Sequence, residues 1–168
     1  VLLGPEMKST GEVMGIDKDF GLAYAKSQIA SQNSLPTKGL AFISLKDRHK
    51  NEGVDLAKQL VKLGFTLCGT EGTANRIIKN GIKCKKINKV SGGSPHIIDV
   101  LNSKKIALVI NTGGGKRAYR IQDSTSLRRS TLINKVPYCT NMSTAYAFLE
   151  AIKSLKTKKI EVKSLQEI

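Results

Sequence analysis

Residues 65–80 read FTLCGTEGTANRIIKN, and in this stretch a short apolar run passes directly into a helical pattern. The β-prone run 65–68 predicts a strand, and 74–80 predicts a helix of two turns. The junction 69–73 (GTEGT) lies between them and supplies two glycines and two threonines. We expect a strand-to-helix turn in which Thr73 caps the following helix.

A junction of this kind can also hold a phosphate group. The first-turn amides of a helix have no acceptor within the helix and carry partial positive charge, so they attract anions. Residues 69–73 by themselves fit an ordinary structural turn slightly better than an anion site. The basic and glycine-rich loops elsewhere in the chain shift the balance toward an anion site.

Apolar runs and helical patterns alternate from Gly39 onward, with short loops between them. This alternation predicts an α/β fold: a three-layer sandwich with about five mostly parallel strands, Rossmann-like in its winding. Strands are expected near 40–45, 65–68, 84–87, 106–110 and 136–139. Helices are expected at 54–63, 73–80, 96–101, around Arg128-Arg129 and at 145–155, the last begun by Ser143 or Thr144.

The first 38 residues differ from the rest in composition. They hold four lysines and four acidic residues, whereas residues 39–168 hold 24 basic and 9 acidic ones and so carry the whole net charge of +15. A helix over 20–29, capped by Asp17 or Asp19, precedes a polar linker at 31–38. We place a domain boundary in that linker, and Val1 in place of Met indicates a segment cut from a longer protein.

The excess of positive charge favours an anionic partner, which could be a phosphorylated small molecule or a nucleic acid. The basic residues are spread in twos and threes with few aromatics between them, and no nucleic-acid motif is present, so a nucleic-acid role rests on charge alone. No apolar run approaches the roughly 20 residues of a membrane span, and no secretory pattern is seen. The cysteines Cys68, Cys84 and Cys139 are widely spaced and are expected to be reduced, as in the cytosol.

The loops that follow the predicted strands share one edge of a parallel sheet, where ligands bind in such folds. Each of them carries Lys, Thr, Ser, Asn or Gly. We expect Lys50, Lys89 and Lys116 to form a basic rim around the helix N-terminus that follows residue 69. The run Gly113-Gly114-Gly115-Lys116-Arg117 lacks the spacing of a phosphate-binding Walker A motif.

Several motifs carry a resemblance to a known family. They are Gly4 to Gly15 (GPEMKSTGEVMG), Thr70-Glu71-Gly72-Thr73, Asn88-Lys89-Val90, Ile110-Asn111-Thr112 and Arg128-Arg129. In this order they resemble the C-terminal end of the large subunit of carbamoyl-phosphate synthase. Residues 1–30 resemble the close of its second ATP-grasp domain. Residues 39–168 resemble its methylglyoxal-synthase-like (MGS-like) allosteric domain.

The resemblance implies a regulatory site for a nucleoside monophosphate, UMP and possibly IMP. Its expected members are Ser44, Lys50, Thr70, Gly72, Thr73, Lys89, Asn111, Thr112, Asp123 and Leu127. Of these, Lys50, Thr70, Thr73 and Lys89 would hold phosphate and ribose, and Asp123 and Leu127 would lie near the base. A second effector, ornithine, would bind between domains near Leu3, Tyr138 and Thr140.

The resemblance also implies a parent enzyme, an ATP-dependent, glutamine-hydrolysing ligase of pyrimidine and arginine biosynthesis. That parent would use ATP with Mg or Mn and K, act in the cytoplasm and pair with a small glutaminase subunit in an oligomer of heterodimers. For this part of it we expect effector binding coupled to synthesis, without catalytic residues, metal or cofactor of its own. Neither nucleic acid nor membrane is an expected partner.

Methylglyoxal synthase shares the fold that the resemblance implies, so a phosphate lyase acting on dihydroxyacetone phosphate is the alternative. Removing a proton next to a carbonyl needs a carboxylate base. In the pattern that this resemblance implies, the catalytic acids fall at Ser94 and near Gly114, where this chain has none. His96 is nearby but follows Pro95 at a helix start, which favours a structural role. We therefore expect binding without turnover.

Overall fold

A computed structural model describes residues 12–94, 96–113, 118–162, 164 and 166. Five parallel strands form one sheet in the order β3-β2-β1-β4-β5. They are β1 (Gly39–Ser44), β2 (Phe65–Gly69), β3 (Lys85–Lys86), β4 (Ile106–Asn111) and β5 (Tyr138–Cys139). The helices are α1 (Phe20–Ala30), α2 (Lys50–Lys62), α3 (Glu71–Lys79), α4 (Ile97–Asn102), α5 (Ala118–Ile133) and α6 (Met142–Thr157), with short 3-10 turns at Asp47–His49 and Val90–Gly92. The predicted α/β class is confirmed.

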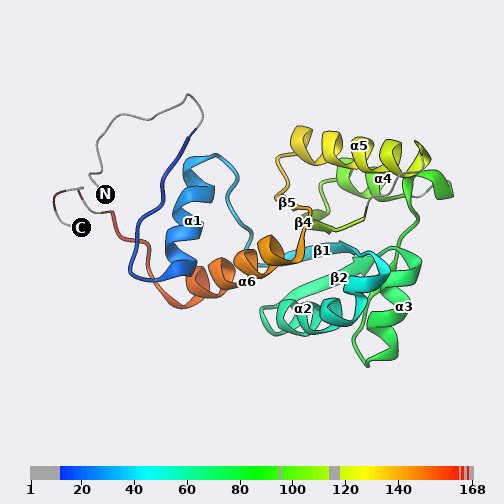
Figure 1. Ribbon diagram of the computed structural model, residues 1–168, viewed down its shortest axis with the longest axis horizontal. Helices are drawn as coiled ribbons and strands as arrows, with labels where there is room; N and C mark the ends of the chain where they lie inside the picture. Colours follow the sequence, from blue (N-terminus) through cyan, green and yellow to red (C-terminus); the bar gives the residue numbers. More distant parts are fainter. Residues whose placement is uncertain (1–11, 95, 114–117, 163, 165, 167–168) are drawn as a thin grey trace.

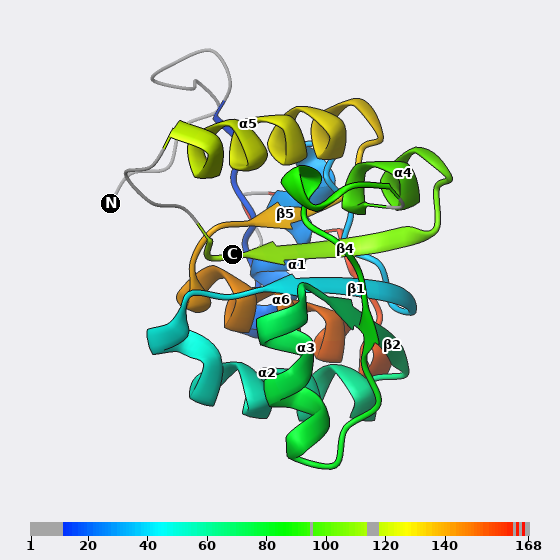
Figure 2. The same cartoon turned by 90° about the vertical axis from the view of Figure 1, so that its right-hand side faces the viewer.

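The sheet is the middle of three layers. Helices α4 and α5 cover one face, and α2, α3 and α6 cover the other (Figures 1 and 2). Side chains alternate across β1 accordingly, since Ala41 and Ile43 join the core under α2 and α6 while Phe42 joins the core under α4 and α5. A strand buried on both faces must be apolar throughout, which is why β1 and β4 read as continuous apolar runs.

Helix α1 packs against α6, beyond the edge of the three layers (Figure 1). The rings of Tyr24 and Phe148 lie 6.1 Å apart, and the Ser154 hydroxyl donates to Asp19 at 2.6 Å. Asp19 also caps α1 by accepting from the Leu22 amide at 2.9 Å. Of the two capping residues that the sequence offered, the structure therefore selects Asp19.

Three predicted helix starts are wrong, and the first is that of α2, which begins at Lys50 and not at 54. Helix α3 begins at Glu71, so Thr70 and not Thr73 occupies the N-cap position. The Thr73 hydroxyl is unavailable for capping because it accepts a hydrogen bond from the Leu45 amide, at 3.0 Å. Helix α6 begins at Met142, and its cap is Asn141, whose side chain accepts from the Thr144 amide at 2.8 Å.

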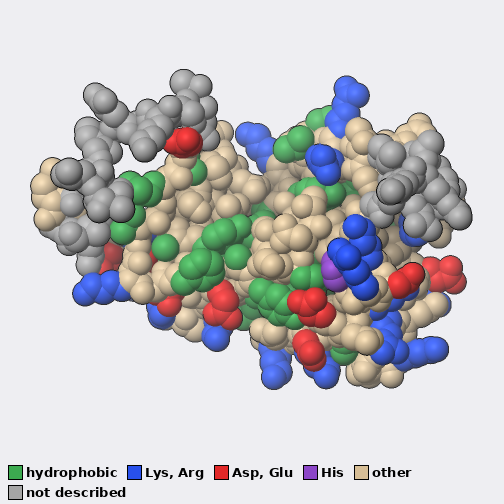
Figure 3. All heavy atoms as spheres, in the orientation of Figure 1, with side chains coloured by type: hydrophobic (Ala, Val, Ile, Leu, Met, Phe, Trp, Pro, Cys, Tyr) green, Lys and Arg blue, Asp and Glu red, His purple; other side chains and the backbone are tan. Residues whose placement is uncertain are grey.

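On the face that Figure 3 shows, the described charged side chains are scattered over several elements. On the face shown in Figure 3, acidic side chains lie among the lysines and arginines, and apolar side chains are exposed over the part that holds α1 and α6. Within the residues that the structure covers, no helix has the length and apolar character to cross a membrane.

Candidate functional site: a polar cavity at the carboxyl edge of the sheet

A polar cavity of about 190 Å³ lies where β1, β2 and β4 end. The strand order reverses between β1 and β4, and ligands of open α/β sheets bind at such switch points. All but one of the residues predicted for the nucleotide site line this cavity. They are Ser44, Lys50, Thr70, Gly72, Thr73, Lys89, Asn111, Asp123 and Leu127. Four separate loops and helix α5 therefore converge on one space.

Buried hydroxyl groups form the floor of the cavity. Thr70 and Thr73 are only 6% and 1% exposed. The Thr70 hydroxyl lies 3.3 Å from that of Ser44 and 3.4 Å from that of Thr73. Because these contacts are long, a ligand oxygen can replace either one at small cost.

The N-terminus of α3 contributes backbone donors. The amides of Thr73 and Ala74 both bond to the Thr70 carbonyl, at 2.9 and 2.8 Å. The helix leaves the amides of Glu71 and Gly72 without an acceptor inside it, and the helix dipole makes them attractive to an anion. A Cβ at Gly72 would lie 2.9 Å from the Lys50 ammonium nitrogen, the end of a flexible side chain, so a larger residue here would displace that ammonium.

The cavity contains acidic as well as basic side chains. Lys46, Lys50 and Lys89 line it, but so do Asp47 and Asp123. Lys50 and Asp47 form an ion pair at 2.6 Å, in which Lys50 is 25% and Asp47 96% exposed. An anion that enters must therefore share Lys50 with a carboxylate of the same loop.

Asn111 and Thr112 have different roles, although both were predicted to line the pocket. Asn111 lines the cavity, and its amide nitrogen donates to the Tyr138 hydroxyl at 3.2 Å. Thr112 is not among the described residues that line the cavity, and its role in the site stays a prediction. Its hydroxyl accepts from the Lys46 amide at 3.1 Å and lies 3.1 Å from Nδ1 of His49, which positions the loop carrying Lys50.

The residues predicted for ornithine stay a prediction. Leu3 lies outside the described residues. The Tyr138 hydroxyl accepts a hydrogen bond from Asn111, and Thr140 is exposed just after β5. Gly114 and Lys116 also lie outside the described residues, so the predicted third lysine of the rim stays a prediction. Ser94 is not in the lining and donates to Asp99 at 2.9 Å.

The sequence interpretation missed several lining residues, and Asp47 is the most consequential among them. The sequence marks the loop 46–50 as a candidate, but it assigns only Lys50 of that loop to the site. Val90 and Ile97 supply an apolar wall from the segment after β3. The sequence offers a signal for both residues, because they lie on either side of Gly92-Gly93 in the segment after β3.

A metal centre finds no support among the described residues, which contain no cluster of three or more His, Cys, Asp or Glu side chains suited to a metal ion. Cys68 and Cys139 are buried, and desolvation raises the pKa of each thiol to about 12. Burial likewise raises the pKa of the half-buried Cys84 to about 11. These thiols are therefore protonated at neutral pH and poor metal ligands or nucleophiles.

The fold corresponds to a known class of domain. The family model described as "MGS-like domain" matches residues 52–140, which include most of the cavity and both edges of the sheet. The chain belongs to the MGS-like domain family. A crystal structure of methylglyoxal synthase from Elizabethkingia anophelis superposes with a TM-score of 0.52 and 18% identity over 70% of this chain and 80% of that one, which shows the shared fold.

Within that family the chain is similar to one group of proteins over nearly its whole length. It is 48% identical over 167 residues to the carbamoyl phosphate synthase large chain of Mesorhizobium japonicum, covering 99% of this chain and 14% of that protein. It is 49% identical over 172 residues to the carbamoyl phosphate synthase large chain, C-terminal section, of Aquifex aeolicus, covering 99% of this chain and 32% of the relative. The chain thus spans a third or less of the length of these relatives, and it matches their C-terminal section.

Proposed function

We propose that this chain is the regulatory C-terminal part of a carbamoyl phosphate synthase large chain and that its polar cavity binds a nucleoside monophosphate, UMP or IMP. One observation carries the proposal: Lys50, the α3 amides and Lys89 converge on one cavity from three different loops. A phosphate group needs fixed donors together with a counter-charge, and this arrangement supplies both. Asp123 and Leu127 on α5 offer an acceptor and an apolar surface for a base.

The proposed regulation is a linkage between sites. The effector would bind one arrangement of this domain against the rest of the large chain more tightly than another, and such couplings are typically about 1–3 kcal/mol. Helix α1, packed on α6, and the linker 31–38 are the proposed mechanical connection. ATP with its metal ions, the small glutaminase subunit and the cytoplasmic synthesis of carbamoyl phosphate belong to the proposed parent protein.

The binding proposal is tested by titrating the chain with UMP and with IMP in a calorimeter. We expect saturable binding of at least one nucleotide, and Lys89→Ala should weaken it by about 1–3 kcal/mol because a charged hydrogen bond is lost. Lys79→Ala, at the opposite end of α3, removes the same charge outside the cavity and should leave the affinity almost unchanged. A folded chain that binds neither nucleotide contradicts the proposal.

A lyase acting on dihydroxyacetone phosphate is the second candidate, because Asp47 and Asp123 place carboxylates in the same cavity. A carboxylate could serve as the base that removes a proton next to the carbonyl. Asp47 is held by Lys50, however, and a general base must be able to reach the substrate carbon. Release of inorganic phosphate from dihydroxyacetone phosphate, abolished by Asp47→Asn or Asp123→Asn, would favour this reading over regulation.

A further inference from the structure

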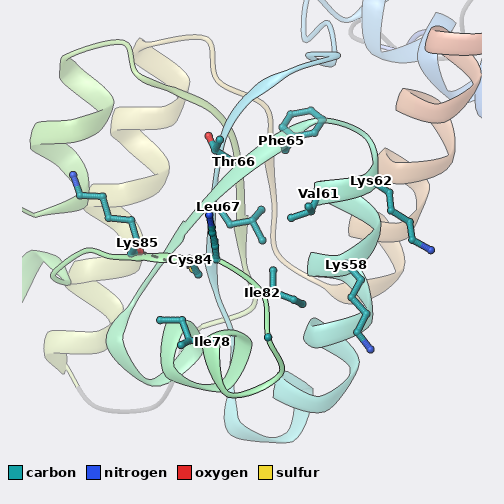
Figure 4. Close-up of a pocket in the computed structure, with 12 residues that line it drawn as sticks. Lys58, Val61, Lys62, Phe65, Thr66, Leu67, Ile78, Ile82, Cys84 and Lys85 are labelled. Atoms are coloured by element: carbon teal, nitrogen blue, oxygen red, sulfur yellow. Dashed lines mark hydrogen bonds between the residues drawn. The ribbon is translucent and has the colours of Figure 1, made fainter.

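A second hollow, of about 1000 Å³, opens at the β2–β3 edge of the sheet, away from β4 (Figure 4). Its walls come from α2, β2, the end of α3 and the segment 81–85. We call it the β2 groove. Its apolar lining consists of Val61, Phe65, Leu67, Ile78 and Ile82, with Cys84 beside them. None of these residues takes part in the polar cavity.

The β2 groove exists because the last strand of the sheet is very short. Strand β3 pairs with β2 only through Cys68 with Lys85 and Gly69 with Lys86. Among the described residues, Phe65 to Leu67 have no ladder partner on this side. The Gly69 carbonyl faces β3, where it accepts from the Ile87 amide at 2.9 Å. Because backbone groups alternate along a strand, those of Leu67 and Phe65 point to the same side.

The walls of the groove leave apolar side chains partly uncovered. Val61 is 45% and Ile78 44% exposed. Figure 4 shows Val61 and Leu67 pointing toward one another across the hollow, with Ile82 and Ile78 below them. Apolar surface that gathers in one concave place marks an interaction site.

The rim of the groove is basic. Lys58, Lys62, Lys83 and Lys85 line it, and no acidic residue is among the described lining residues. Among the described residues, the only carboxylate that pairs with one of these lysines is Asp55, 3.7 Å from Lys58, and both side chains are more than half exposed. Four lysines facing a partner favour negative charge opposite them.

These features select among possible occupants. A second copy of this chain docking groove to groove would oppose lysines with lysines, which is unfavourable. A simple anion would leave the apolar walls and the strand edge unused. A polypeptide strand satisfies all three features, because its backbone pairs with a sheet edge while alternate side chains enter pockets.

We propose that the β2 groove binds an acidic polypeptide segment in extended conformation. The segment adds beside Phe65–Leu67, its apolar side chains fill the hollow against Val61 and Ile78, and its carboxylates face the lysine rim. The site is independent of the polar cavity, which lies at the carboxyl ends of the strands.

The test uses a fluorescent synthetic peptide in which Glu alternates with Val, and fluorescence anisotropy with the whole chain as the readout. We expect saturable binding that weakens as salt is raised. A peptide with Lys in place of Glu and one with Ser in place of Val should each bind about tenfold more weakly or worse, because charge and apolar anchors are both needed. Equal binding of all three peptides, or binding of none, overturns the proposal.

Variants locate the site. Ile78→Asp and Val61→Asp place a carboxylate on the exposed groove wall and should weaken the Glu–Val peptide by about tenfold or more. Leu132→Asp is the matched control, because Leu132 is a 73% exposed leucine on α5, on the other side of the sheet. Loss of peptide binding in Leu132→Asp, or unchanged binding in both groove variants, contradicts the assignment.

Two further measurements separate the alternatives. Sedimentation equilibrium compares the chain with its Ile78→Asp variant, and we expect the same state of association for both. Self-association that Ile78→Asp removes would make a second copy of the chain the occupant. Circular dichroism and UMP titration of the groove variants should match those of the unaltered chain. Loss of peptide binding with these properties intact supports the groove independently of whether UMP binds.

Discussion

At the scale of single residues, Asp47 sets the electrostatic balance of the polar cavity. Its carboxylate lies 2.6 Å from the Lys50 ammonium, and both groups line the space. An entering phosphate must compete with this carboxylate for Lys50. Asp47 is almost fully exposed, and ion pairs open to solvent contribute only about 0–1 kcal/mol, so the competition is mild.

Removing this competitor gives a first prediction. Asp47→Asn should tighten binding of the effector nucleotide by up to about fivefold, since the Lys50 ammonium no longer shares its charge. Calorimetric titration measures the change. Asp55→Asn, which removes an exposed carboxylate next to Lys58 on the outer side of α2, is the control and should have little effect. Weaker binding in Asp47→Asn would mean that this carboxylate contacts the ligand directly.

Thr73 is a second residue whose hydroxyl matters, here for stability. It is 1% exposed, and its Oγ1 accepts from the Leu45 amide at 3.0 Å. Thr73→Val keeps the shape but leaves that buried amide without an acceptor, which should lower the free energy of unfolding by about 1–3 kcal/mol. Urea unfolding measures this loss. Thr73→Ser retains the hydroxyl and should be closer to the unaltered chain, whereas equal losses in both would assign the effect to packing.

At the scale of elements, the contact between α1 and α6 depends on a glycine. A Cβ at Gly21 would lie 2.3 Å from the Ser154 hydroxyl oxygen and 2.5 Å from the Glu150 carbonyl oxygen. In an isolated helix Gly→Ala is stabilising, by about 0.5–1 kcal/mol. The Glu150 carbonyl belongs to the backbone of α6 and cannot move aside, so the steric cost should exceed this gain.

We therefore predict that Gly21→Ala separates α1 from α6 or lowers stability by about 1–3 kcal/mol, the usual cost of overpacking. Limited proteolysis between α1 and β1, together with thermal unfolding, measures the effect. Ile29→Ala, at a 43% exposed position of the same helix, should change both much less. A more stable Gly21→Ala variant would show that α1 is not docked in this way.

Two buried thiols on the strands make the stability of the fold depend on pH under alkaline conditions. Burial raises the pKa of the Cys68 and Cys139 thiols from their ordinary value of 9.0 to about 12. In the unfolded chain these thiols ionise near their ordinary pKa, so above it the unfolded state holds fewer protons than the folded one. The free energy of unfolding should be steady below pH 9.0 and fall as the pH rises toward about 12.

Urea unfolding at increasing pH measures this dependence, and Cys139→Ala should make it shallower, because one ionising thiol is gone from the unfolded state. The variant should also be less stable at neutral pH for lack of the buried sulfur. An unchanged slope would mean that other groups, such as the Tyr24 phenol with its raised pKa, dominate alkaline unfolding.

At the scale of the whole molecule, local patterns predicted the architecture and much of the site. Loops that follow parallel strands meet at one edge, so Ser44, Thr70, Lys89 and Asn111 could be grouped before any coordinates were known. Strands such as β4 were clear because a strand buried on both faces is apolar throughout.

The features that the sequence did not predict depend on contacts between residues distant in sequence. The start of α3 was misplaced because the Thr73 hydroxyl is used by Leu45, 28 positions earlier. Thr112 lies outside the cavity lining because its hydroxyl supports the Lys46–His49 loop, which follows the neighbouring strand β1. The β2 groove could not be predicted from the sequence. Nothing in the segment 81–87 shows that the pairing of this segment with β2 ends after two residue pairs. Register and loop support are set by the assembled fold rather than by neighbouring residues.

The central claim is that the chain binds its effector in the polar cavity at the carboxyl edge of the sheet. Mapping backbone amide chemical shifts by NMR during titration with UMP and IMP tests it most directly. We predict that the largest changes fall on Thr70 to Thr73, Lys89 and Asn111, while Val61 and Ile78 in the β2 groove remain unchanged. Saturable binding whose shifts gather anywhere else, or the absence of shifts in a folded chain, would contradict the account.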